Sequence, residues 1–236
     1  MPQILPVVAG DLSASSARKH LVCVNTLMKN TLFRALNQIL QLVPSIKPSQ
    51  DSFIGFMDYI VVFCDMACLH LVGDERFLTT PNTKGVTLVE VFGIECNPNV
   101  PNLRGGLEIL RETAASFKED PEGADMGKLQ GLLSIGDEME KVMKGQFELM
   151  SNETLGNDIE DEVLNGMIQD NIVWISQNSD MAVLLPFILA HHDPTTAKDW
   201  PQIPAEGLAE LPNLVPVYEE CWKFAPFNPM SGELNV

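Results

Sequence analysis

Apolar residues recur every three to four positions along most of this chain, from about residue 20 to residue 192. That spacing places them on one face of an α-helix, whereas a half-buried strand would alternate apolar and polar residues. No internal repeat or low-complexity tract is visible. The sequence therefore predicts an all-α protein, and we expect its 236 residues to form one helical domain, 1–236.

Prolines, glycines and capping residues divide this pattern into six helical segments. The first should end at Pro44, because proline cannot continue a helix, and Ser52 offers an N-cap for the second. Gly73 is expected to end or loosen the second segment. Residues 86–96 are left open between a short strand and a helical turn. The expected segments are 25–43, 53–73, 103–117, 129–150, 159–175 and 181–192.

The end of the chain, residues 194–236, contains seven prolines and cannot form one long helix. It also carries aromatic residues that would form an exposed apolar patch if this segment were a free tail. We therefore expect an irregular C-terminal arm whose aromatic side chains pack against a core formed by about residues 20–193. The aromatic residues concerned are Trp200, Tyr218, Trp222, Phe224 and Phe227.

The chain is strongly acidic, with 15 Lys plus Arg against 32 Asp plus Glu and a formal net charge of −17. Nucleic acid and anionic lipid are bound by clustered basic residues, so we expect neither as a partner. The apolar run 181–190 is shorter than the ~20 residues that a membrane-spanning helix needs. No signal sequence is visible, and five cysteines in apolar stretches are typical of buried thiols. These features predict a cytoplasmic protein.

Most catalytic and cofactor-binding motifs are absent, so the four histidines carry the chemical argument. His70 and Asp74 lie one helical turn apart, a geometry that suits an acid/base pair, a metal pair or a purely structural hydrogen bond. His191 and His192 either cap a helix end or point inward. Consecutive helical residues diverge by ~100°, so only one of them should face the core, and the apolar stripe favours His192.

Several segments resemble fungal hemerythrin-like proteins, the HHE cation-binding family. The sequence KNTLFRALN at residues 29–37 resembles the family's opening motif, which begins His-Asn and continues Arg-Gly-Leu-Asn. His70 and Asp74 fall at the family's His-x-x-x-Glu pair, and PFILAHHD at residues 186–193 resembles its C-terminal region. This resemblance covers about residues 20–227. It implies a hemerythrin-like four-helix bundle with additional helices and the C-terminal arm.

The family's di-iron ligands are mostly replaced in this chain. Lys29 stands at the first histidine position, and Val142 and Gln146 stand at the histidine and glutamate positions of the fourth bundle helix. Only His70 and Asp74 retain ligand character, and one imidazole and one carboxylate do not retain iron. We therefore expect no cofactor. A former metal cavity, lined by Val142, Met143, Cys64 and Cys68, would then accept an apolar small molecule. Taken alone, Cys64 and Cys68 lie on one helix face and are also compatible with simple core packing.

Three functions follow from these observations. The favoured one is a metal-independent cyclase, isomerase or lyase that acts by acid/base chemistry on an apolar, polyketide-like substrate in fungal secondary metabolism. The others are a di-iron protein that handles O₂ and a non-enzymatic binding protein. For the first, the candidate catalytic residues are His70, Asp74, His192 and Lys29. The candidate substrate-binding residues are Arg34, Cys64, Cys68, Val142, Met143, Gln146 and His191.

We predict that the purified protein lacks stoichiometric iron, because Lys29, Val142 and Gln146 replace ligands. Elemental analysis of the protein after expression in iron-supplemented medium checks this. Two irons per chain with an oxo-bridged absorption spectrum would contradict it and would favour the O₂-handling alternative.

Overall fold

The computed structural model describes residues 1–7, 16–92, 100–152, 159–197 and 200–235, and within them it is helical with no named strand. The all-α prediction is therefore confirmed. The α-helices are α1 (Ala17–Leu42), α2 (Phe53–Thr79), α3 (Leu88–Phe92), α4 (Val100–Glu119), α5 (Met126–Leu132), α6 (Ile135–Ser151), α7 (Asp161–Gln177), α8 (Met181–His191), α9 (Ala205–Leu214) and α10 (Glu219–Trp222).

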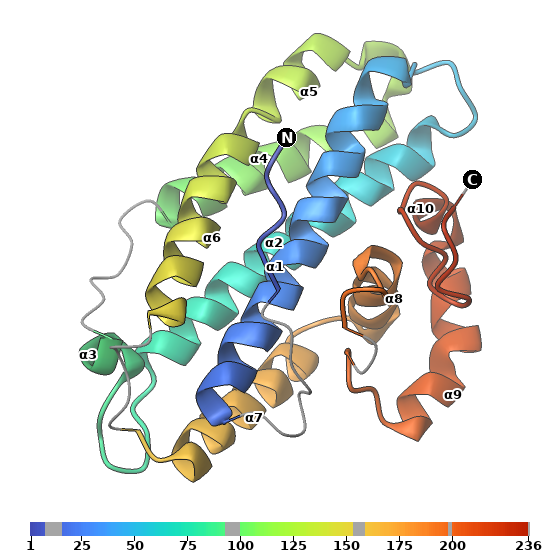
Figure 1. Ribbon diagram of the computed structural model, residues 1–236. Coiled ribbons are helices and arrows are strands. Elements are labelled where there is room, and N and C mark those ends of the chain that lie inside the picture. The colour runs from blue at the N-terminus through green and yellow to red at the C-terminus, as the bar shows by residue number, and fades with distance from the viewer. Residues whose placement is uncertain (8–15, 93–99, 153–158, 198–199, 236) are drawn as a thin grey trace.

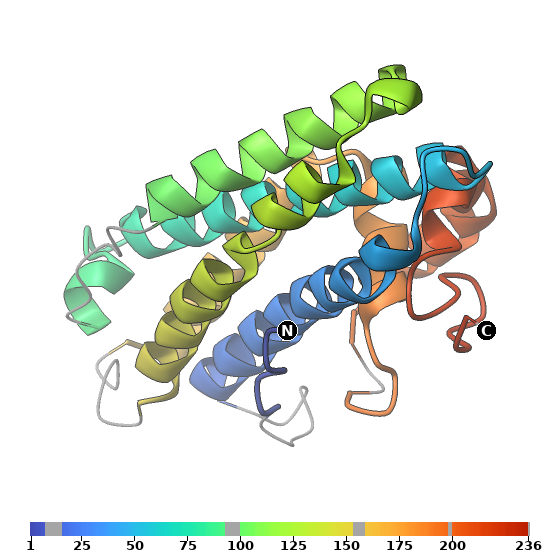
Figure 2. The same cartoon turned by 90° about the horizontal axis from the view of Figure 1, so that it is seen from above.

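The two longest helices, α1 and α2, form the centre of the molecule (Figures 1 and 2). Helix α1 contacts α2 and α6, and α4 contacts α2 and α6, so these four helices surround a common core. The core includes Leu32, Leu36 and Ile39, which the apolar pattern predicted to be buried. Helix α7 contacts both α1 and α2 and closes one end of the space between them.

Helix α2 continues through Gly73 to Thr79, so the prediction that Gly73 ends or loosens this helix is wrong. A Cβ atom at Gly73 would lie 3.4 Å from Cγ1 of Ile175 and 3.5 Å from the ring of Trp174 on α7. Both are ordinary van der Waals distances, so a Cβ atom would also fit here. Gly73 thus lies in the packed interface between α2 and α7 and does not end the helix.

The structure also revises one other segment and decides part of the segment that was left open. The helix expected over 129–150 is two helices, α5 and α6, separated at Leu133 and Ser134, where the Ser134 hydroxyl donates to the carbonyl of Gly131. Such a local side-chain bond competes with the helical pattern. Residues 88–92 form the short helix α3, so the helical alternative for that segment is correct; residues 93–96 lie outside the described part of the chain.

The C-terminal arm packs on the helical core, as its aromatic residues predicted. Trp222 is buried in the main core, Phe224 stacks edge-on against Phe56 of α2, and Trp200 packs on Cys23 and Leu27 of α1. The arm is more regular than expected because it contains α9 and α10. Figure 1 shows both helices beside α8, on one side of the long helices. Pro204 directly precedes α9, a place where its lack of an N–H is tolerated.

By length and composition, α2 could cross a membrane, since an 18-residue window in it has a mean hydropathy of 1.6. The bent pair α7–α8 passes the same test only if it is counted as one broken span. However, 67 % of the α2 window is buried inside the fold, which is also the property of a core helix. The apolar length of α2 is therefore accounted for by its central position between α1 and α4.

Candidate functional site

A charged pair lies buried between the two central helices. The side chain of Lys29 on α1 is fully buried, and its Nζ atom lies 2.7 Å from Oδ2 of Asp74 on α2. Asp74 is 3 % exposed. Burying either charge alone costs several kcal/mol, so the two groups require each other at this depth. The sequence predicted both residues as catalytic candidates, and the structure brings them into direct contact.

Two further polar side chains complete the cluster around the Lys29 ammonium group. Lys29 Nζ donates a hydrogen bond to Oδ1 of Asn25 at 2.7 Å, and it lies 3.3 Å from Nε2 of His70. With Asp74 Oδ2, these atoms match the three donors that an ammonium group carries. His70 Nε2 also lies 3.4 Å from Asp74 Oδ2, so it faces both the ammonium group and the carboxylate. If Nε2 accepts the third N–H of Lys29, the proton of a neutral His70 ring lies on Nδ1; if it donates to Asp74, the proton lies on Nε2.

Burial and charge set the protonation states in this cluster. Burial lowers the pKa of His70 to about 4, against the opposing effect of the Asp74 carboxylate, and the Lys29 ammonium lowers it further. The pKa of His70 therefore lies well below neutral pH, because the effect of desolvation on the ring outweighs that of its carboxylate neighbour. Burial alone would raise the pKa of Asp74, but His70, Lys29 and the hydrogen bonds from Lys29 and Asn25 hold it below its usual value.

A small cavity of about 70 Å³ borders the cluster. His70, Asp74 and Asn25 belong to its lining, and no described residue hydrogen-bonds His70 Nδ1. Lys29 does not line it. Its remaining lining comes from α1, α2 and α7 and is mostly apolar: Leu21, Val24, Met28, Phe77, Ile168, Asn171, Ile172 and Ile175.

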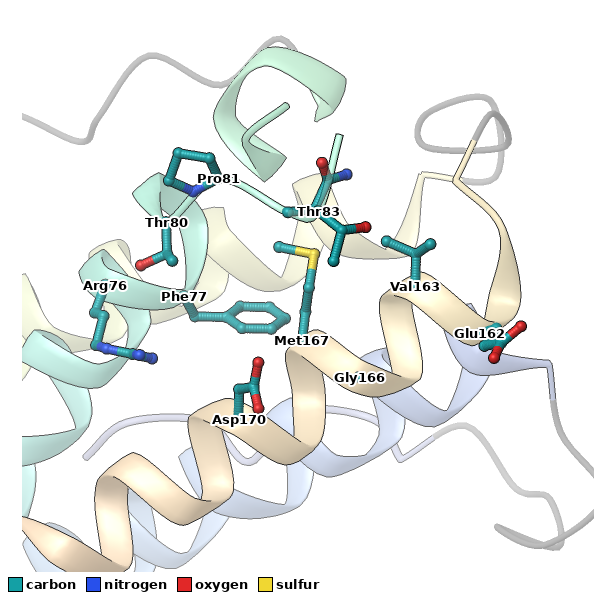
Figure 3. A pocket seen from close by; sticks show the side chains of 11 residues that line it. Arg76, Phe77, Thr80, Pro81, Thr83, Glu162, Val163, Gly166, Met167 and Asp170 are labelled. Atoms are coloured by element: carbon teal, nitrogen blue, oxygen red, sulfur yellow. The ribbon is translucent and has the colours of Figure 1, made fainter. Parts of the chain in front are cut away.

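A larger pocket of about 380 Å³ lies directly beside this cavity, between the end of α2, the segment that follows it and α7. Phe77 belongs to the lining of both spaces and so forms their common wall. Figure 3 shows the Phe77 ring pointing toward Met167 of α7, with Arg76 to its left, Asp170 below it and Thr80 and Thr83 above it. The smaller space is itself open to the surface, because the exposed side chain of Ile172 belongs to its lining.

The two consecutive histidines do not behave as predicted. His191, not His192, faces the core: it is fully buried, its Nδ1 donates to the carbonyl of Phe187, and Tyr59 donates its hydroxyl proton to Nε2 at 2.7 Å. His192 is also buried, because the C-terminal arm covers it through Trp200 and the carbonyl of Ala197. The sequence argument failed because it allowed for only one buried side of α8.

The other candidate residues lie apart from the cluster. Arg34 donates to the carbonyl of His191 and lies 3.9 Å from Asp193, and it lines neither cavity described above. Cys64, Val142 and Met143 are fully buried core residues, and Cys68 packs against that core. Burial raises the pKa of Cys68 to about 11, so its thiol is protonated. Gln146 is half-buried on α6, and its Oε1 atom has no hydrogen-bond partner.

The described residues do not fit the di-iron centre that the family resemblance implies. They contain no group of three His, Cys, Asp or Glu side chains that could hold a metal ion. At the place where His70 and Asp74 meet, the Lys29 ammonium already lies 3.3 Å from the imidazole and 2.7 Å from the carboxylate. A metal cation placed between these donors would be repelled by that charge.

Sequence reasoning missed Asn25 and Phe77. Asn25 could have been found, because it precedes Lys29 by four residues and so lies on the same helix face. Phe77 carried no such signal. Its importance depends on α7, and the sequence does not specify how α7 crosses α2.

Comparison with known proteins adds no relative: no family model, no curated protein and no solved structure matches the chain. The functional argument therefore depends on the geometry of the buried cluster and of the two spaces beside it.

We predict that Asp74→Asn lowers the free energy of unfolding by about 3–5 kcal/mol, because it leaves the Lys29 charge buried without its counter-charge. Lys29→Met combined with Asp74→Asn should recover most of that loss. Urea unfolding of the two single variants and the double variant measures the coupling. The exposed pair Lys84–Glu160 is the control, and Lys84→Met should change stability by less than about 0.5 kcal/mol. Additive effects of the two core substitutions would contradict the coupling.

We also predict that the protein loses stability as the pH falls from 6.5 toward 4. Burial lowers the folded-state pKa of His70 to about 4 and that of His191 to about 3, whereas both rings titrate near 6.5 when unfolded. Between these values the unfolded chain binds more protons, so acid favours unfolding. His70 alone should account for up to about 3 kcal/mol. Denaturant unfolding at several pH values measures the slope, and His70→Asn should reduce it. A slope of zero over this range would contradict the assignment.

Proposed function

We propose that this chain is a metal-independent enzyme of the isomerase, cyclase or lyase type, acting by proton transfer on an apolar carbonyl compound. The observation that carries the proposal is the charged cluster of Lys29, Asp74 and His70 at the polar end of an otherwise apolar cavity. Buried titratable groups with displaced pKa values beside a cavity are typical of catalytic sites.

We further propose that the fold is a hemerythrin-like four-helix bundle of α1, α2, α4 and α6. The closed ring of contacts among these four helices supports it, as does the meeting of Lys29 and His70 in the interior. In the family that the sequence resembles, these positions would face the metal. An ammonium group would then stand in for the metal charge and leave the neighbouring side chains free for acid/base work.

The roles of the side chains follow from their protonation states. We assign the neutral His70 ring the tautomer with its proton on Nδ1, from which it donates a hydrogen bond to the carbonyl oxygen of the substrate and stabilises the enolate without losing the proton. The Asp74 carboxylate, which also lines the cavity, accepts a proton from the carbon next to that carbonyl. Returning this proton to a different carbon completes an isomerisation with no net change in atoms. Lys29 does not line the cavity, so it is a positioning residue for His70 and Asp74.

The size of the cavity limits which part of a substrate reacts. A cavity of about 150 Å³ encloses benzene, so the 70 Å³ beside His70 admits only the end of a larger molecule. The polyketide-like substrate expected from the sequence would therefore place one carbonyl group in this cavity. Its apolar remainder would lie outside, past Phe77.

We predict that the protein catalyses exchange of α-protons for deuterium in apolar ketones, because enolisation is the step shared by these reactions. A panel of cyclic and aryl ketones incubated in D₂O, with deuterium uptake measured by mass spectrometry, gives the rate. His70→Ala should lower that rate about 10²–10⁴-fold, the usual contribution of a general acid or base. Lys84→Met, on an exposed ion pair, should leave it unchanged.

The melting temperature of each variant must be measured beside its rate, since His70 is buried. Exchange at the wild-type rate in a folded His70→Ala protein would remove His70 from the mechanism. Ketones that bind the wild-type protein but show no exchange would instead favour the non-enzymatic binding protein.

A further inference from the structure

The larger pocket beside Phe77 has both room and an apolar floor for an organic ligand. Its volume of about 380 Å³ is more than twice that of a cavity that holds benzene. Phe77, Pro81, Val163 and Met167 supply the apolar lining, and Thr80 and Thr83 add hydroxyl groups whose side chains form no hydrogen bond with any described residue. Figure 3 shows these side chains around one opening, with the polar groups at its edges.

Arg76 is the one basic side chain in this lining, and it has no acidic partner within the described part of the chain. By contrast, Arg34, Arg104 and Arg111 each lie within 4 Å of a carboxylate. The Arg76 guanidinium group instead lies over the ring of Trp174, 5.6 Å from its centroid. That contact holds the planar guanidinium in place and leaves its N–H groups free, which is the arrangement that binds a carboxylate through two parallel hydrogen bonds.

We propose that this pocket binds the carboxylate group of an apolar organic acid, with Arg76 as the anchor. The inference rests on the proposed function in one respect: it identifies the outer pocket as the place of the substrate's apolar body. The ligand would lie on Phe77 and Met167, with its carboxylate at Arg76 and its reactive end directed past Phe77 toward His70.

Two carboxylates, Glu162 and Asp170, also line the pocket and oppose an anionic ligand. Both are exposed to solvent, so their charges are screened by water and salt, whereas Arg76 is half-buried. Asp170 lies one turn from Trp174 on α7, yet it forms no ion pair with Arg76. If the charges of these two carboxylates outweighed that of Arg76, the pocket would bind an amine more tightly than an acid. The test therefore includes an amine with the same apolar body.

Gly166 gives the test a specific way to fill the pocket. It lies in the lining, and a Cβ atom built there meets no atom within 4 Å. A larger side chain should therefore occupy the pocket without disturbing the helix, where glycine is in any case a poor helix former. Gly145, in the middle of α6, has equally open space and does not line the pocket, so it is the matched control.

The experiment compares three ligands with the same apolar body: 3-phenylpropanoate, 3-phenylpropan-1-ol and 3-phenylpropylamine. Their affinities for the full chain are measured by titration calorimetry at fixed ionic strength. The wild-type protein should bind the acid at least about tenfold more tightly than the alcohol, as expected for a charge-assisted pair. Arg76→Met keeps an apolar contact with Trp174 and should abolish that preference. Arg76→Lys, which keeps the charge but not the planar fork, should restore part of it.

Gly166→Leu should weaken binding of all three ligands at least tenfold. Gly145→Leu, the control, should weaken none of them. If Gly166→Leu fails to fold, Gly166→Ala repeats the test with a smaller side chain. Equal affinities for acid and alcohol, the tightest binding for the amine, or an acid preference that survives Arg76→Met would each overturn the inference. His70→Ala separates the two proposals. It should lower deuterium exchange about 10²–10⁴-fold and leave binding of 3-phenylpropanoate at Arg76 unchanged, so a failure of catalysis does not count against the carboxylate site.

Discussion

The ammonium group of Lys29 is the constraint on which the centre of this structure depends. It is fully buried between α1 and α2, and the cost of burying it is offset only because Asp74, Asn25 and His70 surround it. These partners come from both helices, so sliding α1 along α2 by one turn would leave a charge unpaired in the core. The polar cluster therefore specifies how the two longest helices align, whereas their apolar stripes would tolerate more than one alignment.

The same cluster determines the chemical state of His70. Where Nε2 accepts a proton from Lys29, as the proposed function requires, the neutral ring carries its own proton on Nδ1. Desolvation, reinforced by the Lys29 charge, then keeps the imidazole neutral well below neutral pH. A histidine that binds no metal and remains neutral can act as a hydrogen-bond donor of fixed direction. The interaction that stabilises the core is thus also the one that prepares the residue for the proposed chemistry.

Sequence patterns predicted the type and ends of helices better than they predicted how the helices pack on one another. The three-to-four spacing gave the all-α class, and Pro44 marked the end of α1 correctly. Gly73 was misinterpreted because glycine is common at helix ends, whereas here α2 continues past it and packs on α7. His192 was expected to face the core in place of His191 because only one apolar face of α8 was considered. The C-terminal arm buries a second face of this helix, so both side chains are buried. Lys29, His70 and Asp74 could be named from the sequence, but their mutual contact depends on how α1 lies against α2.

The position of Phe77 connects the buried cluster with the surface. This side chain is 4 % exposed and forms the wall between a cavity of about 70 Å³ and a pocket of about 380 Å³. The smaller space also reaches the surface beside α7, because the exposed side chain of Ile172 belongs to its lining. His70 and Asp74 can therefore be approached without displacing the Phe77 ring. Under the proposed function, the outer pocket would select the ligand by its carboxylate and apolar body. The small cavity would then admit only the reacting carbonyl group. Arg76 on one side of Phe77 would select the ligand, and His70 and Asp74 on the other side would carry out the proton transfer.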